Sequence, residues 1–532
     1  MAPRHPILAD RPRRWAFVGG CAAVTAGVAL HLPMLWMGRA SGFRLAEMPM
    51  EAGMLWGMAL ILAGLGVAAW GLLPGAPAAA APVLAVRAPE DARLGPAHWR
   101  LIAVLTLALV IDVMKPASLG FVVPGMRDEY GVPARTVAWL PFAALCGTVL
   151  GSLVWGWLAD LYGRRASILL SAVMFVGTAI CGAMPSLWWN VGMCFLMGAA
   201  AGGMLPLTYA LLAETMPSRH RSGVLVLVGG LGAAGGYLAA SALAAWLIPH
   251  FGWRVMWLLN LPTGLLLVGL NACIPESPRY LAARGRLAEA LATLRGFGCE
   301  VLDLAGQARQ DAADAARRLA AAAPAARGLA GGLVARTWAL SIAALAWGLV
   351  NFGLLLWMPE HLIERGWGIE LSSLLLAASA LIAVPTVFVA ALAYGLWSSK
   401  GALLAAVAVT ALGLLGLVGL ELADPGQVSP VAPVALLIIG VNAIIAMLLP
   451  YAAESYPLRL RGRATGWVAA CTKAGGLGAQ LLSLLGWVPA MKLAALGVLV
   501  PVLLALAMLW RWGLETRGRD LRDLDPAPAA AD

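Results

Sequence analysis

Charged residues are scarce in this sequence of 532 residues: Lys, Arg, Asp and Glu together make up 12% of it. Soluble domains contain about 25% charged residues, so the composition excludes a soluble enzyme or binding domain. Hydrophobic residues account for 61%, and the mean hydropathy is +0.83. They form separate runs of roughly 20 residues, the length that a helix needs to cross a bilayer. The sequence therefore predicts an all-α integral membrane protein rather than a barrel of short alternating strands.

Motifs for nucleotide-driven or covalent chemistry are also missing. The sequence has no G-x-x-x-x-G-K-[ST] segment, so ATP-driven pumping has no support. It shows no catalytic constellation either, and we expect neither enzymatic activity nor a cofactor. The net charge of +10 reflects Arg residues between the apolar runs, where membrane topology explains them without nucleic-acid binding. The seven cysteines include no C-x-x-C pair, so we interpret them as packed thiols rather than disulfides or metal ligands.

The apolar runs predict fourteen membrane spans. Two of them, 15–37 and 53–74, form an extra N-terminal hairpin ahead of a core of twelve. A Pro/Ala-rich linker, 75–99, follows the hairpin. A polar segment rich in Ala, Arg and Leu, 282–336, divides the core into two sets of six and is expected to hold short cytoplasmic helices. The core spans are expected at 101–124, 137–158, 166–184, 188–212, 223–248, 253–274, 337–358, 372–396, 401–421, 432–452, 464–487 and 491–512.

The distribution of positive charge predicts the orientation of these spans. Arg and Lys residues gather in alternate loops, beginning with the N-terminal tail, and the opposite loops are poorer in them. By the positive-inside rule, both termini then lie in the cytoplasm, in a bacterial-type inner membrane. The expected division of the chain is a tail and hairpin (1–74), a linker (75–99), an N-terminal six-helix half (100–274), a cytoplasmic loop (275–336), a C-terminal six-helix half (337–512) and a cytoplasmic tail (513–532).

An internal repeat relates the two halves. Residues 214–221 read ETMPSRHR and residues 454–461 read ESYPLRLR, each just after an even-numbered core span. A second pair has diverged: GWLADLYGRR at 156–165 corresponds to ALAYGLWSSK at 391–400. The same pattern at the same place in each half is typical of a duplicated transporter.

These segments resemble signatures of the major facilitator superfamily. GWLADLYGRR matches G-x-L-x-D-x-x-G-R-R at every defined position, and the resemblance covers about 100–525. PESPRYL (275–281), the E-x-x-P-x-x-x-R-x-x-x-x-G segment from Glu454 and LETRGRDL (514–521) are similar to motifs of sugar porters. The same motifs occur in metabolite:proton symporters of the niacin, aromatic-acid and synaptic-vesicle-protein types. The resemblance implies a carrier of two six-helix halves but does not identify its substrate.

The resemblance also implies which residues control the opening of a carrier of this kind. Glu and Arg at cytoplasmic helix ends would form ion pairs that hold the halves together, and breaking them would accompany opening to the cytoplasm. The alternative is that the Arg residues serve only as topology determinants. The expected gating residues are Gly156, Asp160, Gly163, Arg164, Arg165, Glu214, Pro217, Arg221, Glu276, Arg279, Glu454, Pro457, Arg461, Gly466 and Glu515.

Three charges interrupt the apolar core spans: Asp112 and Lys115 in the first and Lys473 in the eleventh. A charge near mid-span costs about 2.5–3.5 kcal/mol on insertion scales, so it usually faces a cavity or a partner. Carriers built from repeats bind substrate near the midplane between their halves. We therefore expect Asp112 to carry a coupling proton and Lys115 and Lys473 to hold an anion in one central cavity.

Two other interpretations of these charges remain open. Asp112 and Lys115 could pair with each other at i, i+3, or the charges could line a cavity for a neutral polyol. Niacin and aromatic-acid carriers often show D-x-x-D in this helix; Lys115 replaces the second acid here, which favours an anion. Further substrate-binding candidates, each open to the alternative of helix packing, are Asn351, Asn442, Gln480 and Tyr209.

The N-terminal hairpin carries thioether and imidazole groups, which Cu(I) favours as ligands. Methionine also fills irregular gaps between helices, so we favour packing or docking of a partner and expect no metal. The weak metal candidates are His31, Met34, Met37, Met48, Met50 and Met54.

Taken together, these patterns predict a proton-coupled symporter that imports a small organic anion by alternating access. A sugar or polyol:proton symporter is the first alternative. A drug or metabolite exporter and a non-transporting membrane sensor are the others. The expected partners are a small-molecule substrate, protons and the lipid bilayer, with a monomeric transport unit.

Overall fold

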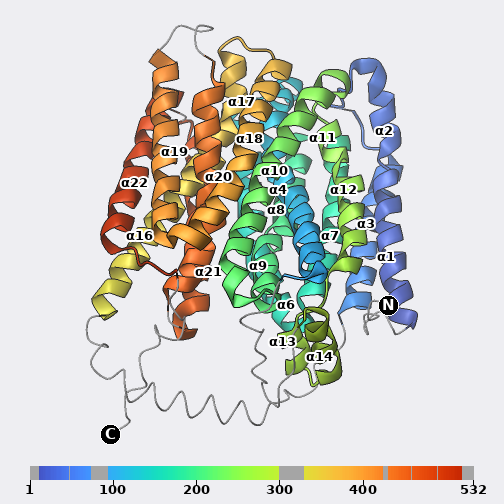
Figure 1. Ribbon diagram of the computed structural model, residues 1–532. Coiled ribbons are helices and arrows are strands. Elements are labelled where there is room, and N and C mark those ends of the chain that lie inside the picture. The colour runs from blue at the N-terminus through green and yellow to red at the C-terminus, as the bar shows by residue number, and fades with distance from the viewer. Residues whose placement is uncertain are drawn as a thin grey trace.

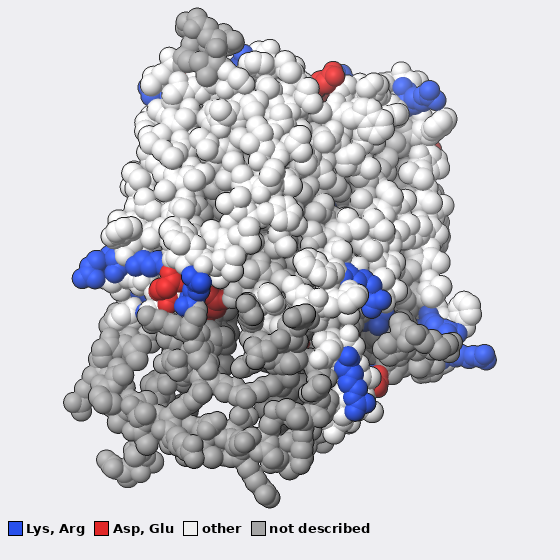
Figure 2. Space-filling view, in the orientation of Figure 1, with Lys and Arg blue, Asp and Glu red and all other residues white. Residues whose placement is uncertain are grey.

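The computed structural model describes residues 11–46, 48–73, 94–298, 329–422, 429–456, 458–487 and 489–517, and these residues form helices and no strands. The helices run side by side as a bundle with connections at its two ends (Figure 1). The space-filling view shows a broad uncharged band, with charged side chains gathered toward the two ends (Figure 2). A bundle with such a band is the expected form of an all-α membrane protein.

Six core spans make up the N-terminal half, and short breaks divide several of them. The fourth span, for example, is interrupted at Gly202 and Gly203, which separate its two helices. The elements are α4 (Pro96–Tyr130), α5 (Ala134–Val137) with α6 (Trp139–Tyr162), α7 (Arg164–Gly177) with η3 (Thr178–Ala183), α8 (Leu187–Ala201) with α9 (Met204–Thr215), α10 (Ser218–Phe251), and α11 (Val255–Leu258) with α12 (Asn260–Leu270) and η4 (Asn271–Cys273).

Six further spans make up the C-terminal half, in the same order. Two of them contain a short π-helical stretch, η5 and η6, where an extra residue widens the helix. The elements are α16 (Leu329–Leu349) with η5 (Val350–Leu354) and α17 (Leu355–Glu364), α18 (Ile369–Leu392) with η6 (Ala393–Trp397), α19 (Ser399–Leu422), α20 (Val431–Ser455), α21 (Leu458–Leu484) and α22 (Met491–Trp512).

The segment of the chain that connects the two halves forms short helices outside the bundle, as expected. They are α13 (Pro278–Ala283) and α14 (Leu287–Gly296), and Figure 1 places them beyond one end of the bundle, which we call the α13–α14 end. The rest of the expected loop up to residue 328 and most of the linker, residues 74–93, lie outside the described residues.

Thirteen helices of the described chain are long and apolar enough to cross a membrane. The fourteenth expected span is α21, which has 27 residues and is long enough to cross as well. It is missing from the thirteen because polar residues such as Thr472, Lys473 and Gln480 lower its hydropathy. The twelve-helix core and the extra hairpin are therefore both present, and one core span is distinctly more polar than the rest.

The N-terminal hairpin packs on one side of the N-terminal half, beside α7 (Figure 1). It consists of α1 (Arg11–Ala29), α2 (Leu32–Met37), η2 (Gly38–Ser41) and α3 (Ala52–Leu72). The two long helices touch through glycines: a Cβ at Gly20 or Gly64 would lie within 3 Å of the facing backbone. Tryptophans are exposed near both ends of the hairpin, where aromatic rings anchor a helix at membrane interfaces: Trp15, Trp36, Trp56 and Trp70.

The two halves meet chiefly along four pairs of facing helices. Helix α10 packs against α18 and α20, α4 packs against α17, and α6 packs against α21. This arrangement leaves a space between the halves that residues from both of them line.

Candidate functional site

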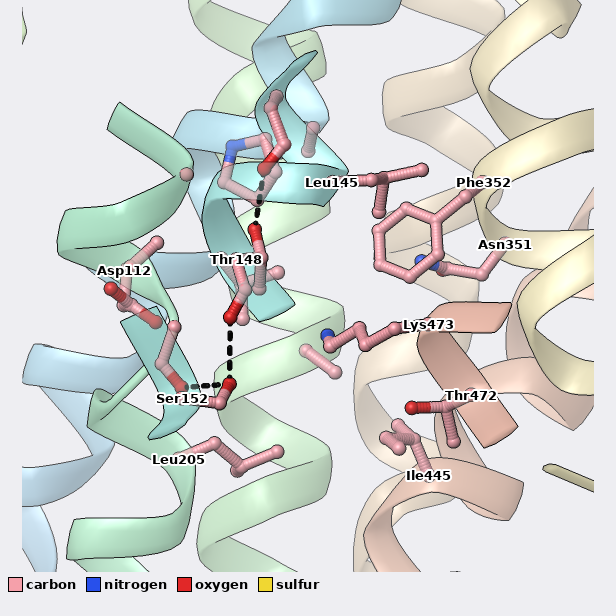
Figure 3. Close-up of a pocket in the computed structure, with 18 of the residues that line it drawn as sticks. Asp112, Leu145, Thr148, Ser152, Leu205, Asn351, Phe352, Ile445, Thr472 and Lys473 are labelled. Carbon is pink, nitrogen blue, oxygen red and sulfur yellow. Dashed lines mark hydrogen bonds between the residues drawn. The ribbon is translucent and has the colours of Figure 1, made fainter. Parts of the chain in front are cut away.

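A cavity of about 370 Å³ lies between the two halves, within the size range of small-molecule sites. Its walls come from α4, α6, α8, α9 and α10 on one side and from α16, η5, α17, α20 and α21 on the other. Among the described residues that line it, Asp112 and Lys473 are the two charged ones. Figure 3 shows them on opposite sides of the open space, one from each half.

Asp112 and Lys473 both lie in largely apolar surroundings. Asp112 lies on α4 with 7% of its surface exposed. Lys473 lies on α21, and its ammonium is 5.1 Å from the centre of the Phe352 ring, within cation–π range. The ammonium extends from α21 into the space between the halves (Figure 3). A charge kept in such a place is available to a ligand of opposite sign.

The structure places Lys115 and Gln480 away from the cavity wall. Lys115 is 3% exposed, and its ammonium lies over the Phe175 ring of α7, inside the N-terminal half. Asp112 and Lys115 are both described, and no ion pair within 4 Å joins them. Gln480 donates a hydrogen bond from Nε2 to the carbonyl oxygen of Phe352. Neither Lys115 nor Gln480 is among the residues that line the cavity.

The other predicted polar residues do line the cavity: Asn351, Asn442 and Tyr209. Thr148 and Ser152 on α6 line it as well, but their hydroxyls donate to the backbone oxygens of Ala144 and Gly202 (Figure 3).

Three polar groups on the wall have no hydrogen-bond partner among the described residues. They are the hydroxyl of Tyr209, the hydroxyl of Tyr237 and the side-chain nitrogen of Asn442. Sequence reasoning missed Tyr237, because it ends the glycine-rich stretch GGLGAAGGY of α10. Those glycines pack against α4, since a Cβ at Gly236 would lie 2.7 Å from Cβ of Val113.

The gating motif of the N-terminal half forms a compact cluster at the α13–α14 end. Glu276 Oε1 accepts hydrogen bonds from the backbone nitrogens of Arg164 (2.9 Å) and Arg165 (3.4 Å), at the start of α7. Arg164 Nη2 lies 3.0 Å from Glu214 Oε1. Gly163 has a φ of +99° and faces the Glu276 carboxylate, so a side chain there would be strained and would collide with it.

The C-terminal half repeats this arrangement with different residues. Glu515 Oε1 accepts hydrogen bonds from Ser399 N at 3.0 Å and Ser399 Oγ at 2.6 Å, at the start of α19. Ser398 Oγ also donates to this carboxylate. Tyr394 and Thr516 donate to Glu454 Oε2 at 2.8 and 2.7 Å, where Glu214 has Arg164 as a partner. A glutamate thus contacts the start of the third helix in both halves, and serine hydroxyls add to this contact in the C-terminal half, where SSK replaces GRR.

Contacts between the halves occur at both ends of the bundle. At the α13–α14 end, Ser222 of α10 donates to Glu454 Oε1 of α20 at 2.5 Å. At the opposite end, Arg127 of α4 pairs with Glu360 of α17, and Arg135 Nε donates to the Leu484 oxygen at 2.7 Å. Sequence patterns could not single out Ser222, Arg127 or Glu360, because polar residues near helix ends are common in any membrane protein.

The remaining gating candidates are dispersed. Pro217 precedes α10 with extended backbone, and Arg221 donates weakly to the Met216 oxygen. Gly466 lines the cavity, and a Cβ at Gly156 would meet nothing within 4 Å. The side chains of Asp160, Arg279 and Arg461 and the whole of Pro457 lie outside the described residues.

In the hairpin, His31 is buried, and its Nδ1 is 2.8 Å from the Gly27 oxygen. Met34 and Met54 are buried, Met48 and Met50 are partly buried, and Met37 is exposed. The described residues contain no group of three or more His, Cys, Asp or Glu side chains that could hold a metal. The expectation that the methionines pack between helices rather than bind copper stays a prediction.

Known proteins with similar sequences include several transporters. The niacin transporter NiaP of Acinetobacter baylyi is 26% identical over 403 residues, which cover 74% of this chain and 88% of that protein. The 4-hydroxybenzoate transporter PcaK of the same species is 33% identical over 199 residues, 37% of this chain and 43% of PcaK.

Solved structures show the same fold. The proton:xylose symporter XylE bound to 6-bromo-6-deoxy-D-glucose superimposes with a TM-score of 0.64 at 18% identity, over 80% of this chain and 98% of XylE. Residues 101–479, which include most of both halves and all the residues that line the cavity, match the Major Facilitator Superfamily. The protein is thus a multi-pass membrane transporter rather than an enzyme, and it belongs to the Major Facilitator Superfamily.

Proposed function

We propose that this protein imports a small organic anion together with protons by alternating access. The observation that carries the proposal is that Asp112 of one half and Lys473 of the other line a single cavity between the halves. A carboxyl group and an ammonium in one cavity give one group that can carry a proton and one that can hold an anion.

The chemistry of the wall favours an aromatic carboxylate as the anion. Phe121, Phe352 and Trp347 line the cavity, and the rings of Trp347 and Phe352 are 5.5 Å apart in an edge-on arrangement. Such walls accommodate a flat ring, while Lys473 can bind its carboxylate. The names of two relatives, a niacin transporter and a 4-hydroxybenzoate transporter, support the same substrate class.

The contacts at the two ends of the bundle support alternating access. Opening the α13–α14 end requires the Ser222–Glu454 contact to break, and opening the opposite end requires the Arg127–Glu360 pair to break. We place the α13–α14 end in the cytoplasm of a bacterial-type inner membrane, because the Arg-rich loops lie there. A single chain contains the complete cavity, so we propose that it acts as the transport unit.

A sugar or polyol is the alternative substrate class. The fold is shared with a xylose symporter, and Asn351 and Asn442 could hydrogen-bond to hydroxyls. Uptake into proteoliposomes with an imposed pH gradient, measured with labelled benzoate, nicotinate and xylose, separates the two classes. We expect the acids to accumulate; accumulation of xylose without either acid would disprove the anion proposal.

The Asp112→Asn variant tests the proton site. Because an amide cannot release a proton, proton-driven accumulation should be lost, whereas exchange of substrate across the membrane without a pH gradient should continue. Asp128→Asn is the matched control, since Asp128 is exposed on the same helix. If Asp112→Asn still accumulates substrate against a gradient, Asp112 does not carry the proton.

A further inference from the structure

The cavity wall formed by α10 and its neighbours holds polar groups that the proposed anion and proton sites do not use. The hydroxyls of Tyr209 and Tyr237 and the amide nitrogen of Asn442 are buried and have no partner among the described residues. Asn442 is only 7% exposed. A buried polar group without a partner is costly, so a ligand that supplies the partner gains binding energy from each of them.

Tyr237 lies on a different wall of the cavity from Lys473. Helix α10, which carries Tyr237, packs against α18 and α20, whereas α21, which carries Lys473, packs against α16 and α6. The two helices therefore line different walls. The packing of Gly236 on Val113 of α4 places Tyr237 at about the level of Asp112 along the bundle. Asn442 lies on α20, which packs against both α10 and α21 and so lies between these two walls.

The two tyrosines are separated along the cavity. The hydroxyl of Tyr209 lies against Gly229 of α10, and Gly229 is eight residues before Tyr237. Eight residues of helix correspond to about 12 Å along the backbone, so the two tyrosines approach α10 at different levels. Tyr237 is the better placed of them: it lies at the level of Asp112, and its ring is 6.1 Å from that of Phe121, another residue of the cavity wall.

We propose that Tyr237, assisted by Asn442, is a specificity-determining residue that binds a hydrogen-bonding group on the far side of the substrate from its carboxylate. The preferred substrates are then aromatic carboxylates with a ring hydroxyl or ring nitrogen away from the acid group, and unsubstituted aromatic acids bind more weakly. This inference rests on the proposed function, because it takes Lys473 as the carboxylate site.

The test compares benzoate with 4-hydroxybenzoate, which differ by one hydroxyl, in the full-length protein in proteoliposomes. The affinity of each acid is measured as the concentration of unlabelled acid that halves the exchange of labelled 4-hydroxybenzoate. The wild type should prefer 4-hydroxybenzoate by about tenfold, the typical scale of one buried hydrogen bond. Tyr237→Phe, which removes one oxygen and keeps the ring, should lower 4-hydroxybenzoate affinity about five- to tenfold and leave benzoate affinity unchanged.

Two controls and a second readout separate recognition from packing. Tyr280→Phe, on α13 outside the cavity, should change neither affinity. Tyr209→Phe should change the preference less than Tyr237→Phe. In detergent, the rise in Tm that 4-hydroxybenzoate produces should shrink in Tyr237→Phe, while the rise that benzoate produces should not.

The outcomes are distinguishable. Equal losses for both acids in Tyr237→Phe, or a wild type without preference, would overturn the inference and leave the proposed anion transport intact. Failure of the wild type to bind either acid would overturn the proposed function as well.

Discussion

Glu276 and Glu515 occupy equivalent positions in the two halves: each accepts a hydrogen bond from the first backbone nitrogen of the third helix of its half. The donors are Arg164 N at 2.9 Å and Ser399 N at 3.0 Å. A carboxylate at a helix N-terminus satisfies free N–H groups and interacts favourably with the helix dipole. Each Glu thereby ties the segment after the last helix of its half to the start of the third helix.

The stability of the C-terminal half should depend on pH through Glu515. Burial raises the pKa of Glu515, but hydrogen bonds from Ser398, Ser399 and the Arg517 backbone outweigh it and lower the pKa from 4.5 to about 2. A carboxyl group whose pKa is lowered on folding stabilises the protein above its unfolded pKa and loses this contribution as the pH falls toward the folded value.

The Tm in detergent should therefore differ most between the wild type and Glu515→Gln above pH 5, and the difference should shrink as the pH falls toward 2. Glu370→Gln is a control at an exposed helix start. A difference that grows on acidification would contradict this prediction.

Lys473 should matter more than Lys115 for substrate affinity. Hydrogen bonds to charged groups contribute about 1.5–3 kcal/mol, so Lys473→Gln should weaken carboxylate binding at least tenfold. Lys115 lies over Phe175 behind the wall, and Lys115→Gln should weaken it less. Competition binding measures both, with Lys492→Gln as a control outside the cavity. Equal losses of affinity in Lys473→Gln and Lys115→Gln would show that Lys473 has no special contact with the anion.

Breaking the Arg127–Glu360 pair should favour opening of the end opposite to α13 and α14. Both side chains are partly exposed, so the pair contributes up to about 1 kcal/mol, or a roughly fivefold change in population. In Arg127→Gln, an impermeant thiol reagent added from that end should label a cysteine introduced at Thr148 faster. The charge-reversed double variant Arg127→Glu/Glu360→Arg should restore the wild-type rate. Labelling that is no faster in Arg127→Gln than in the wild type would exclude the pair from gating.

The N-terminal hairpin should be an integral part of the N-terminal half. Its loop donates backbone hydrogen bonds from Leu45 (2.6 Å) and Ala46 (3.0 Å) to Glu129, which also pairs with the buried Arg254 at 2.6 Å. Removing one partner of a buried ion pair costs about 3–5 kcal/mol.

Glu129→Gln should therefore lower the Tm in detergent far more than Glu289→Gln, which breaks the half-exposed pair with Arg286. Limited proteolysis of the hairpin loop should also become faster in Glu129→Gln. Equal Tm values in the two variants would mean that the loop is not anchored through Glu129.

Much of this architecture could be predicted from the sequence, because long apolar runs and Arg-rich loops report spans directly. The position of Asp112 and Lys473 in one cavity followed from their place in the first and eleventh core spans. The direction of Lys115 did not. Helix α4 is apolar on almost every side, so its hydrophobic pattern does not indicate which face meets the cavity.

Other contacts depend on geometry that a sequence does not encode locally. In the sequence, Ser398 and Ser399 replace the glycine and arginine of the motif. Their hydroxyls nevertheless donate to the Glu515 carboxylate, which also accepts a hydrogen bond from the Ser399 backbone nitrogen. In the sequence, Tyr237 is simply the residue after a glycine-rich packing stretch. The three-dimensional structure is needed to see that it lines the cavity and that its hydroxyl has no partner among the described residues.

The polar character of α21 has a consequence for how the protein is made. A helix that carries Lys473 and Gln480 enters the bilayer with a large penalty, since a central Lys alone costs about 2.5–3.5 kcal/mol on insertion scales. The helix before it, α20, and the helix after it, α22, are both far more apolar. During synthesis α21 must therefore depend on these neighbours and on α16, which it packs against, to stay in the membrane. The lysine that we propose binds the anion thus makes the insertion of α21 into the bilayer more costly than that of the helices on either side of it.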